Sequence, residues 1–309
     1  MLLLEYLLFL HQMHKTLIHV GYPKTATTWF VRNFYPGVRN AETIFFKDFE
    51  FNLTDGNKFF KIKKDLSSLQ KEIRIVASNA FSGLINFKWN NGDNRIFFIE
   101  QLKKNFPQAS IILFIRNQVD FIASGYSTYL THGGTYTFDK LFKPGLIEGE
   151  LFPLEFLNYC ETIRIFQESF GKENVHIYIY EEFLENNEAF IKKFIEMHGL
   201  EISINDLHFG KANEKLRTGL AGLLRFSNKC MTKGARPKKA FCNIPFFNSC
   251  LVKRIERLNK FAIFGEQLNR KKILSKDQEE YLNNYFKSSN QELVEKFGLD
   301  EIKKYHYPL

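Results

Sequence analysis

Short apolar, β-rich runs alternate with amphipathic helical segments along most of the chain. Four runs have the length and composition of buried strands, at residues 16–20, 74–77, 110–115 and 175–180. Helical periodicity lies between and after them, at residues 27–34, 96–105, 117–130, 155–170, 188–198 (ended by Gly199) and 276–297. Because such alternation is typical of βαβ units, the sequence predicts an α/β fold, a three-layer sandwich with a central, mostly parallel sheet.

Chain length and the N-terminal segment limit the domain organisation. A chain of 309 residues can form one large α/β domain or two smaller ones, and no repeat or linker divides this one. We therefore predict a single domain over residues 15–309, preceded by an extension at residues 1–14. The apolar run at residues 1–10 is too short to span a membrane, and it lacks the basic start and cleavage site of a signal peptide.

The cysteines indicate the chemical environment of the chain. There are four of them, with no CxxC pair and no histidine at metal-ligand spacing. A disulfide framework is not expected in so long and cysteine-poor a chain. We therefore expect a reducing, cytoplasmic environment, no bound metal and no membrane span.

Positive charge is concentrated in one segment. Residues 211–272 contain 16 Lys and Arg against three Glu, a local balance of +13, while the remainder of the chain sums to −4. The same segment has weak periodicity and several turn residues, which predicts a loop-rich insertion packed on the same domain. Such a segment favours an anionic ligand, nucleic acid or an acidic membrane surface as partner, although a solvated lysine-rich surface has the same composition.

The turn after the first predicted strand reads Gly21-Tyr-Pro-Lys-Thr-Ala-Thr-Thr-Trp29. A strand-to-helix turn presents free backbone N–H groups at the positive end of the helix dipole, an arrangement that suits phosphate. Lys24 adds a mobile cation, and Thr25, Thr27 and Thr28 add hydroxyl donors. The segment is no Walker A loop, because that motif needs a second glycine directly before its lysine. An ordinary turn with a capping threonine is the alternative.

A second motif follows the strand predicted at residues 110–115. Arg116 leaves the end of this strand, where its planar fork suits phosphate, and Ser124 lies eight residues further on, two turns along the next predicted helix. A lone arginine at a strand end is more often part of a surface salt bridge. Two such motifs in order, about ninety residues apart in this sequence, are an improbable coincidence.

Together these motifs resemble those of sulfotransferases that use 3′-phosphoadenylyl sulfate (PAPS). Residues 22–29 are similar to that family's loop for the 5′-phosphosulfate, Tyr-Pro-Lys-Ser-Gly-Thr-Thr-Trp, and Arg116 with Ser124 resembles its site for the 3′-phosphate. The resemblance implies a P-loop NTPase-like sulfotransferase fold, PAPS as cofactor, 3′,5′-adenosine bisphosphate as product, and no metal. Ala26 replaces the usual glycine, which implies either a right-handed backbone there or strain.

The resemblance also implies roles for single residues. Lys24 would stabilise the charge that develops in sulfuryl transfer, while Tyr180, in Tyr180-Glu-Glu-Phe183, and Trp29 would lie near the adenine. Trp29 is almost equally well read as a core residue. Late-loop contacts to the 3′-phosphate have two candidate segments, residues 213–217 and 233–236, from which we name Lys215 and Arg217. The predicted nucleotide-binding set is thus Lys24, Thr25, Ala26, Thr27, Thr28, Trp29, Arg116, Ser124, Tyr180, Lys215 and Arg217.

The general base is the least certain element of the motif set. Family members place a histidine or glutamate where this chain has Asn79, and an amide cannot accept a proton at neutral pH. Glycan-modifying members use a Lys-Glu pair earlier in the chain, which Lys47-Asp48 resembles, and His132 is a further candidate. Our hypothesis is that Asp48 is the base, although a pair of this kind is more often part of a polar loop, here near Phe45 and Phe46.

The sequence therefore predicts a sulfotransferase that moves a sulfuryl group from PAPS to a hydroxyl or amine. A saccharide or glycoconjugate acceptor is favoured, because the basic segment could hold an anionic glycan. We expect no nucleic-acid partner and at most peripheral contact with a membrane. The alternatives are a P-loop kinase or NTPase, which would depend on Mg²⁺, and a catalytically degenerate binding protein with the same fold.

Overall fold

The computed structural model describes residues 14–83, 94–142, 154–209, 216–230, 239–241, 254–255 and 257–309. By its contacts the chain divides into two compact units. The sheet unit comprises Met1–Ile85, Asn90–Arg116 and Tyr159–Gly210, and the helical unit comprises Asn86–Trp89, Asn117–Asn158 and Lys211–Leu309. The single domain over residues 15–309 stays a prediction, and the extension at residues 1–14 lies outside the described residues apart from His14.

The sheet unit is built on five parallel strands in the order β2-β5-β1-β6-β7. The four predicted strands are β1, β5, β6 and β7, each within one residue of its expected ends. The strand bounds are β1 Lys15–Gly21, β2 Ala41–Phe45, β5 Ile73–Ser78, β6 Ser110–Ile115 and β7 Val175–Ile179, with a separate antiparallel hairpin of β3 Phe49–Asn52 and β4 Phe59–Ile62. The predicted α/β class with a parallel central sheet is confirmed.

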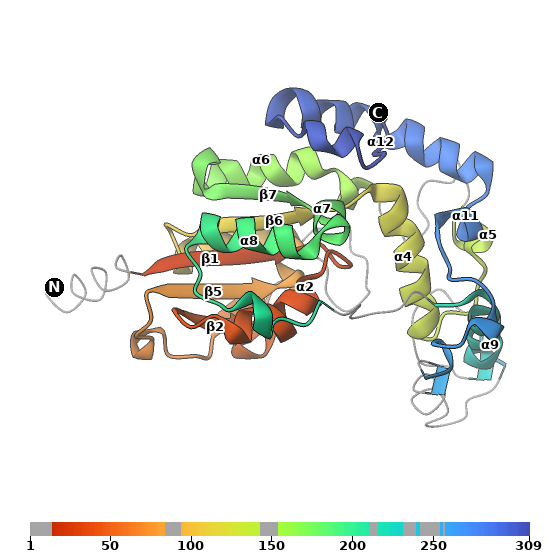
Figure 1. Cartoon of the computed structure of the whole chain (residues 1–309), viewed down its shortest axis with the longest axis horizontal. Coiled ribbons are helices and arrows are strands. Elements are labelled where there is room, and N and C mark those ends of the chain that lie inside the picture. The colour runs from red at the N-terminus through yellow and green to blue at the C-terminus, as the bar shows by residue number, and fades with distance from the viewer. Residues whose placement is uncertain are drawn as a thin grey trace, which may run out of the picture. The chain divides into compact units, whose positions relative to one another are not determined.

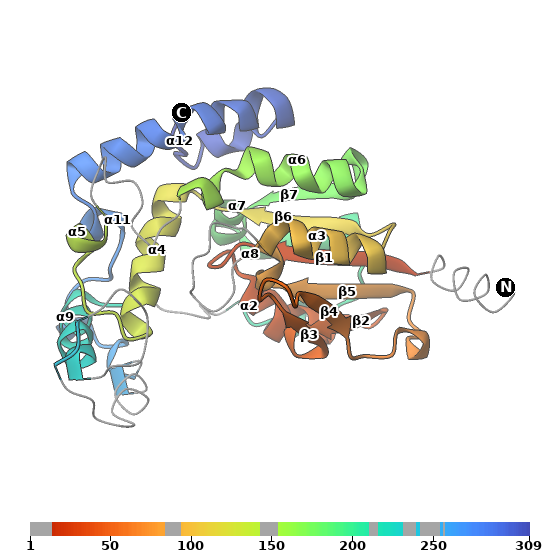
Figure 2. The ribbon, with the colours of Figure 1, turned by 180° about the vertical axis from the view of Figure 1, so that it is seen from behind.

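Helices cover both faces of this sheet, as the two opposite views in Figures 1 and 2 show. Alternate residues of β1, β5 and β6, such as Leu17, Ile75 and Phe114, pack with the first helix and α8 into one buried cluster rich in phenylalanine. The intervening residues, such as Ile18 and Leu113, are equally buried on the other face. This alternation follows from the period of two along a strand, and it forms the three layers predicted.

The helices of the sheet unit largely follow the predicted pattern. Their bounds are α2 Thr27–Trp29, continued by a π-helical turn at Phe30–Phe34, α3 Asn94–Asn105, α6 Tyr159–Phe170, α7 Tyr180–Glu185 and α8 Asn187–His198. One correction concerns the helix expected from residue 155. Residues Leu154–Leu157 form a 3₁₀ turn instead, and α6 begins only at Tyr159.

The helical unit contains α4 Gln118–Thr131, α5 Phe138–Leu141, α9 Thr218–Ser227, α11 Arg270–Ile273 and α12 Lys276–Phe297. Helix α12 has the predicted bounds and begins with a capping box between Ser275 and Gln278. Gln118 of α4 and Asn290 of α12 exchange two buried side-chain hydrogen bonds, at 2.6 and 3.2 Å. Helix α9 lies inside the segment predicted to be loop-rich. No helix in the described ranges combines the length and apolarity needed to cross a bilayer.

Two buried histidines on one face of the sheet make the stability of the sheet unit sensitive to pH. His19 of β1 is fully buried, stacks on Phe114 at a centroid distance of 5.1 Å, and hydrogen-bonds with the Tyr35 hydroxyl at 2.6 Å. His198 ends α8 and hydrogen-bonds with the Tyr178 hydroxyl at 2.7 Å. Burial lowers the pKa of each histidine to about 3, with a neighbouring positive group adding to the effect.

We therefore expect the free energy of unfolding to fall as pH falls below 6.5, the pKa of an unfolded histidine. Between that pH and about 3 the unfolded chain binds protons that the folded chain does not. The loss is about 1.4 kcal/mol per pH unit for each histidine. Urea unfolding at pH 7 and pH 5 should show a smaller pH dependence in His198→Gln than in the unaltered chain.

A matched control is Ile191→Val, a buried substitution in α8 without a titratable group. It should cost about 1 kcal/mol equally at both pH values. An unchanged pH dependence in His198→Gln would contradict the role given to this histidine.

Candidate functional site

The turn between β1 and α2 has an unusual backbone. Lys24 and Ala26 both adopt positive φ, 67° and 62°, whereas the φ of Thr25 between them is not positive. Ala26, at ψ 5°, is the N-cap of α2. Of the two alternatives for Ala26, the strained one is therefore found. When residues with a left-handed backbone alternate with residues in other conformations, successive backbone N–H groups point toward one place. Such an arrangement binds anions.

The donors of this turn are free to bind such an anion. Among the described residues, no hydrogen bond is found from the backbone N–H groups of residues 24–28, whereas those of Trp29 and Phe30 bond to the Ala26 carbonyl. The Thr27 hydroxyl is buried and also lacks a partner within the described ranges. A side chain at Gly21 would place its Cβ 1.7 Å from the Thr27 hydroxyl oxygen, so only glycine fits at the end of β1.

Arg116 lies directly against this turn. Its residue is only 8% exposed, and its Nη1 donates to the carbonyl oxygen of Lys24 at 3.0 Å. The guanidinium lies 4.9 Å from the centroid of the Tyr180 ring, a cation–π contact. Its Nε has no hydrogen-bond partner among the described residues. Because β1 and β6 are parallel neighbours, their carboxyl ends deliver Lys24 and Arg116 to the same edge of the sheet.

Residues of helix α6 form hydrogen bonds with both motifs. The hydroxyl of Tyr159 donates to the Arg116 carbonyl at 2.6 Å, and that of Tyr22 hydrogen-bonds with Thr162 at 2.7 Å. The rings of Tyr22 and Tyr159 meet edge to face at 4.9 Å. Sequence reasoning missed Tyr159 and Thr162, since nothing in a helix-face tyrosine or threonine distinguishes such a supporting role.

The Lys24 side chain faces an electropositive neighbourhood. Its ammonium makes no hydrogen bond or ion pair with the described residues. Although Lys24 keeps an exposed surface, desolvation by the protein around it, and then the positive charge of Arg116, lower its pKa. Two neighbouring cations, of which Lys24 has no carboxylate partner among the described residues, favour an anionic ligand with more than one charge.

The other residues of the sheet unit that are predicted to contact the nucleotide differ in whether their side chains already have partners. The Thr25 hydroxyl is committed to the Tyr22 carbonyl at 2.6 Å, whereas Thr28 is exposed. Trp29 is 4% exposed, donates to the His208 carbonyl at 3.0 Å, and stacks on Phe209. This is the environment of a core residue, and its contact with a base stays a prediction.

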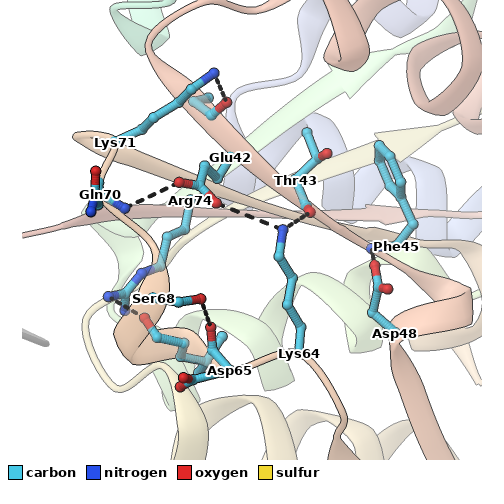
Figure 3. A network of polar contacts seen from close by, with 12 residues as sticks. Glu42, Thr43, Phe45, Asp48, Lys64, Asp65, Ser68, Gln70, Lys71 and Arg74 are labelled. Carbon is cyan, nitrogen blue, oxygen red and sulfur yellow. Dashed lines mark hydrogen bonds and ion pairs between the residues drawn. The ribbon is translucent and has the colours of Figure 1, made fainter.

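Asp48 follows the edge strand β2 at the same end of the sheet. Its carboxylate accepts the backbone N–H of Phe45 at 2.9 Å and so caps the 3₁₀ turn Phe46–Asp48, as Figure 3 shows. It also lines an open pocket of about 610 Å³, together with Thr43, Phe45, Lys47, Lys63 and Lys64. The sequence interpretation missed Lys63 and Lys64, because they come from the segment after β4 and only the fold brings them to Asp48.

Three candidates remain, one in the sheet unit and two in the helical unit. Asn79 is exposed directly after β5, at the same sheet edge, and its carbonyl accepts from Ser82. In the helical unit, Ser124 lies within α4, and His132 caps the end of that helix through a 2.9 Å contact of its ring Nδ1 with the Thr128 carbonyl.

Arg217 and Lys215 were predicted as late-loop phosphate contacts. Arg217 of the helical unit donates to the backbone carbonyls of Asn259 and Gly265, at 2.8 and 2.7 Å, so it braces a loop of its own unit. Lys215 lies outside the described residues. Among those residues there is also no group of three or more His, Cys, Asp or Glu placed to hold a metal ion.

Comparison with known proteins gives structural neighbours only. The sequence matches no protein-family model and no curated protein. A sulfotransferase from Alicyclobacillus acidocaldarius is similar at a TM-score of 0.46 and 15% identity, over 81% of this chain and 98% of that one. The mouse sulfotransferase SULT7A1 complexed with PAP is similar at a TM-score of 0.47 and 15% identity, over 96% of this chain and 92% of that one. No residue role is transferred from either.

The strained backbone at Ala26 predicts that Ala26→Gly stabilises the protein. A left-handed alanine costs about 1–2 kcal/mol, and glycine loses about 0.5–1 kcal/mol more conformational entropy on folding. We expect a net gain of about 0.5–1 kcal/mol in urea unfolding. Ala189→Gly, at an exposed position of α8 without positive φ, should instead lose about as much. Equal losses in both variants would contradict strain at Ala26.

Proposed function

We propose that this chain is a sulfotransferase that moves a sulfuryl group from PAPS to a hydroxyl or amine of an acceptor. The observation that carries the proposal is the 3.0 Å hydrogen bond from Arg116 Nη1 to the Lys24 carbonyl. It joins the two motifs that resemble the sites for the two ends of PAPS. A nucleotide with phosphates at both ends needs two separate cationic sites within its own length, and this pair supplies them.

Unpaired donors around the two motifs support the same ligand. Burying a polar group without a hydrogen bond costs about 1–3 kcal/mol, so such groups usually serve a ligand. Here the Thr27 hydroxyl, the Arg116 Nε and the backbone N–H groups of residues 24–28 all lack partners among the described residues. All of these groups can donate a hydrogen bond, which suits anionic oxygens.

When bound, PAPS supplies the activated sulfuryl group. The N–H groups of the turn and the Thr27 hydroxyl would hold the phosphosulfate end, and Arg116 would hold a phosphate of the other end. Lys24 would neutralise charge that develops on the oxygen of the departing phosphate. Its lowered pKa makes its proton easier to give to that oxygen than the proton of an ordinary lysine.

The acceptor side of the proposal rests on the pocket beside β2. Its lining residues Lys47, Lys63 and Lys64 are cationic, and Asp48 is its carboxylate. Since β2 is separated from β1 only by β5, and parallel strands lie about 4.8 Å apart, the pocket is on the sheet edge that carries Lys24. An anionic saccharide fits this charge, and we infer Asp48 as the base that takes its hydroxyl proton.

One observation favours a second candidate, a binding protein without turnover. Asn79 occupies the strand end where the resemblance implies a base, and Asp48 already accepts a backbone hydrogen bond. In that case the nucleotide would bind and no sulfuryl group would be transferred. The third alternative is a kinase or NTPase, which would bind ATP in preference to 3′,5′-adenosine bisphosphate and would require Mg²⁺.

Nucleotide binding is tested first by thermal unfolding of the full chain. We expect 3′,5′-adenosine bisphosphate to stabilise it without Mg²⁺, by about 2.7 kcal/mol at a hundred times its Kd. Arg116→Lys should remove most of this stabilisation, because an ammonium cannot replace the planar fork. Arg164→Lys, on the exposed face of α6, should leave it unchanged. Stronger stabilisation by ATP with Mg²⁺ would favour the kinase reading and overturn ours.

Catalysis is tested at Asp48. In Asp48→Asn the side-chain oxygen can still accept the Phe45 N–H, so the 3₁₀ turn should persist while the base is lost. We expect turnover to fall by roughly 10²–10⁴-fold with bisphosphate binding unchanged. Asp65→Asn, which likewise caps a 3₁₀ turn through its carboxylate, is the matched control and should retain full turnover. Full activity in Asp48→Asn would remove it as the base, and no sulfate transfer by the unaltered chain would favour the binding protein.

A further inference from the structure

Several large apolar side chains of the helical unit are exposed. On α9, Leu223 is 45% and Phe226 is 69% exposed, and on the 3₁₀ loop after Lys260, Phe261 is 59% and Ile263 is 88% exposed. We call these four residues the α9 surface. Gly219, Leu223 and Phe226 have the spacing of a single helix face, and this face is exposed throughout. Single exposed apolar residues are ordinary, but a row of them is not.

The fold holds these side chains outward. Arg217, just before α9, donates to the carbonyls of Asn259 and Gly265 and thereby fixes both ends of the 3₁₀ loop. The Thr218 N–H donates to the Glu266 carbonyl at 2.9 Å. The loop also packs closely on α9, since a Cβ on Gly219 would come within 2.9 Å of the Phe264 carbonyl oxygen. These contacts hold the loop in place, so the exposure of Phe261 and Ile263 does not result from loose packing.

The segment that contains the α9 surface is rich in positive charge. The sequence from residue 216 to residue 265 contains eleven Lys and Arg against Glu256 alone. Seven of the eleven are among the described residues, and Arg257 and Lys260 are exposed directly before Phe261. At the other end of α9, the Lys229 ammonium lies 5.6 Å from the ring centroid of Phe241, which is itself 79% exposed.

This combination of charge and apolarity distinguishes between occupants. A second copy of the chain would bring the same positive surface against itself in a two-fold interface, which is unfavourable. Nucleic acid would satisfy the charges but would leave the aliphatic Leu223 and Ile263 without a partner. The surface of a bilayer with anionic lipids satisfies both, because Phe, Leu and Ile enter the interfacial region while Lys and Arg meet the headgroups.

We propose that the α9 surface docks the protein on membranes that contain anionic lipids. The bound chain would be peripheral, anchored by Phe261 and Ile263 at the apex of the loop and by Leu223 and Phe226 along the helix. The proposal is independent of sulfuryl transfer, because it concerns residues of the helical unit alone.

The test is sedimentation of the full chain with vesicles of phosphatidylcholine, with and without about one-third phosphatidylglycerol. We expect binding only to the anionic vesicles, weakened by salt as the charges are screened. Phe261→Ser with Ile263→Ser should weaken binding by at least about tenfold, since it removes the apolar anchors. Arg257→Gln with Lys260→Gln should also weaken it by roughly tenfold or more.

Matched controls lie in the sheet unit. Ile96→Ser removes an apolar side chain that is 56% exposed on α3, and Lys193→Gln removes an exposed charge on α8, so both should bind vesicles unaltered. The melting temperature of each variant checks that it is folded. Absence of binding to anionic vesicles, or binding insensitive to the Phe261 and Ile263 substitutions, would overturn the proposal. So would a dimer in sedimentation equilibrium that Ile263→Ser dissociates, because the occupant would then be a second copy.

Discussion

The candidate site depends on one contact, the hydrogen bond from the Arg116 guanidinium to the carbonyl oxygen of Lys24. Two residues 92 positions apart can meet there because β1 and β6 are adjacent and parallel, so that both chains leave the sheet at the same edge. In this contact the Lys24 carbonyl faces the arginine, and the backbone N–H groups of the turn take no part in it. The left-handed backbone of Lys24 and Ala26 is compatible with that orientation, and its strain is the cost of displaying donors rather than bonding them internally.

The same contact explains the electrostatics of the site. Lys24 and Arg116 carry like charges, and no carboxylate pairs with Lys24 in the part of the chain that the structure describes. Two tyrosines support Arg116 in place of a carboxylate, because the buried Tyr159 donates to the Arg116 carbonyl and the half-buried Tyr180 contacts its guanidinium with the ring face. Burial raises the pKa of both tyrosines, so they remain neutral and add no negative charge to compete with an anionic ligand.

Much of this arrangement could be predicted from the sequence, and the failures have physical causes. The buried strands were predicted because continuous apolar runs have few alternative structures. Lys24 and Arg116 were predicted from the motifs that come after two of these strands. Strand β2, with the sequence Ala-Glu-Thr-Ile-Phe, was not predicted. It is an edge strand and only half-buried, so it lacks a continuous apolar run. The left-handed Ala26 could not be decided from sequence, since local propensity opposes a positive φ at alanine. Trp29 was ambiguous because core packing and base stacking require the same side chain.

The free edge of β2 shows how the needs of the fold constrain the acceptor pocket. An unpaired strand edge invites aggregation, and here side chains occupy it. Lys71 donates to the Ala41 carbonyl, Lys64 to the Thr43 carbonyl, and Asp48 accepts the Phe45 N–H, as Figure 3 shows. Lys64 and Asp48 are therefore part of the fold as well as of the pocket, whereas Lys47 and Lys63 are exposed and make neither of these edge contacts. Selectivity for an acceptor can thus change at Lys47 and Lys63 without exposing the strand, while Lys64 and Asp48 can change only together with the edge that they cover.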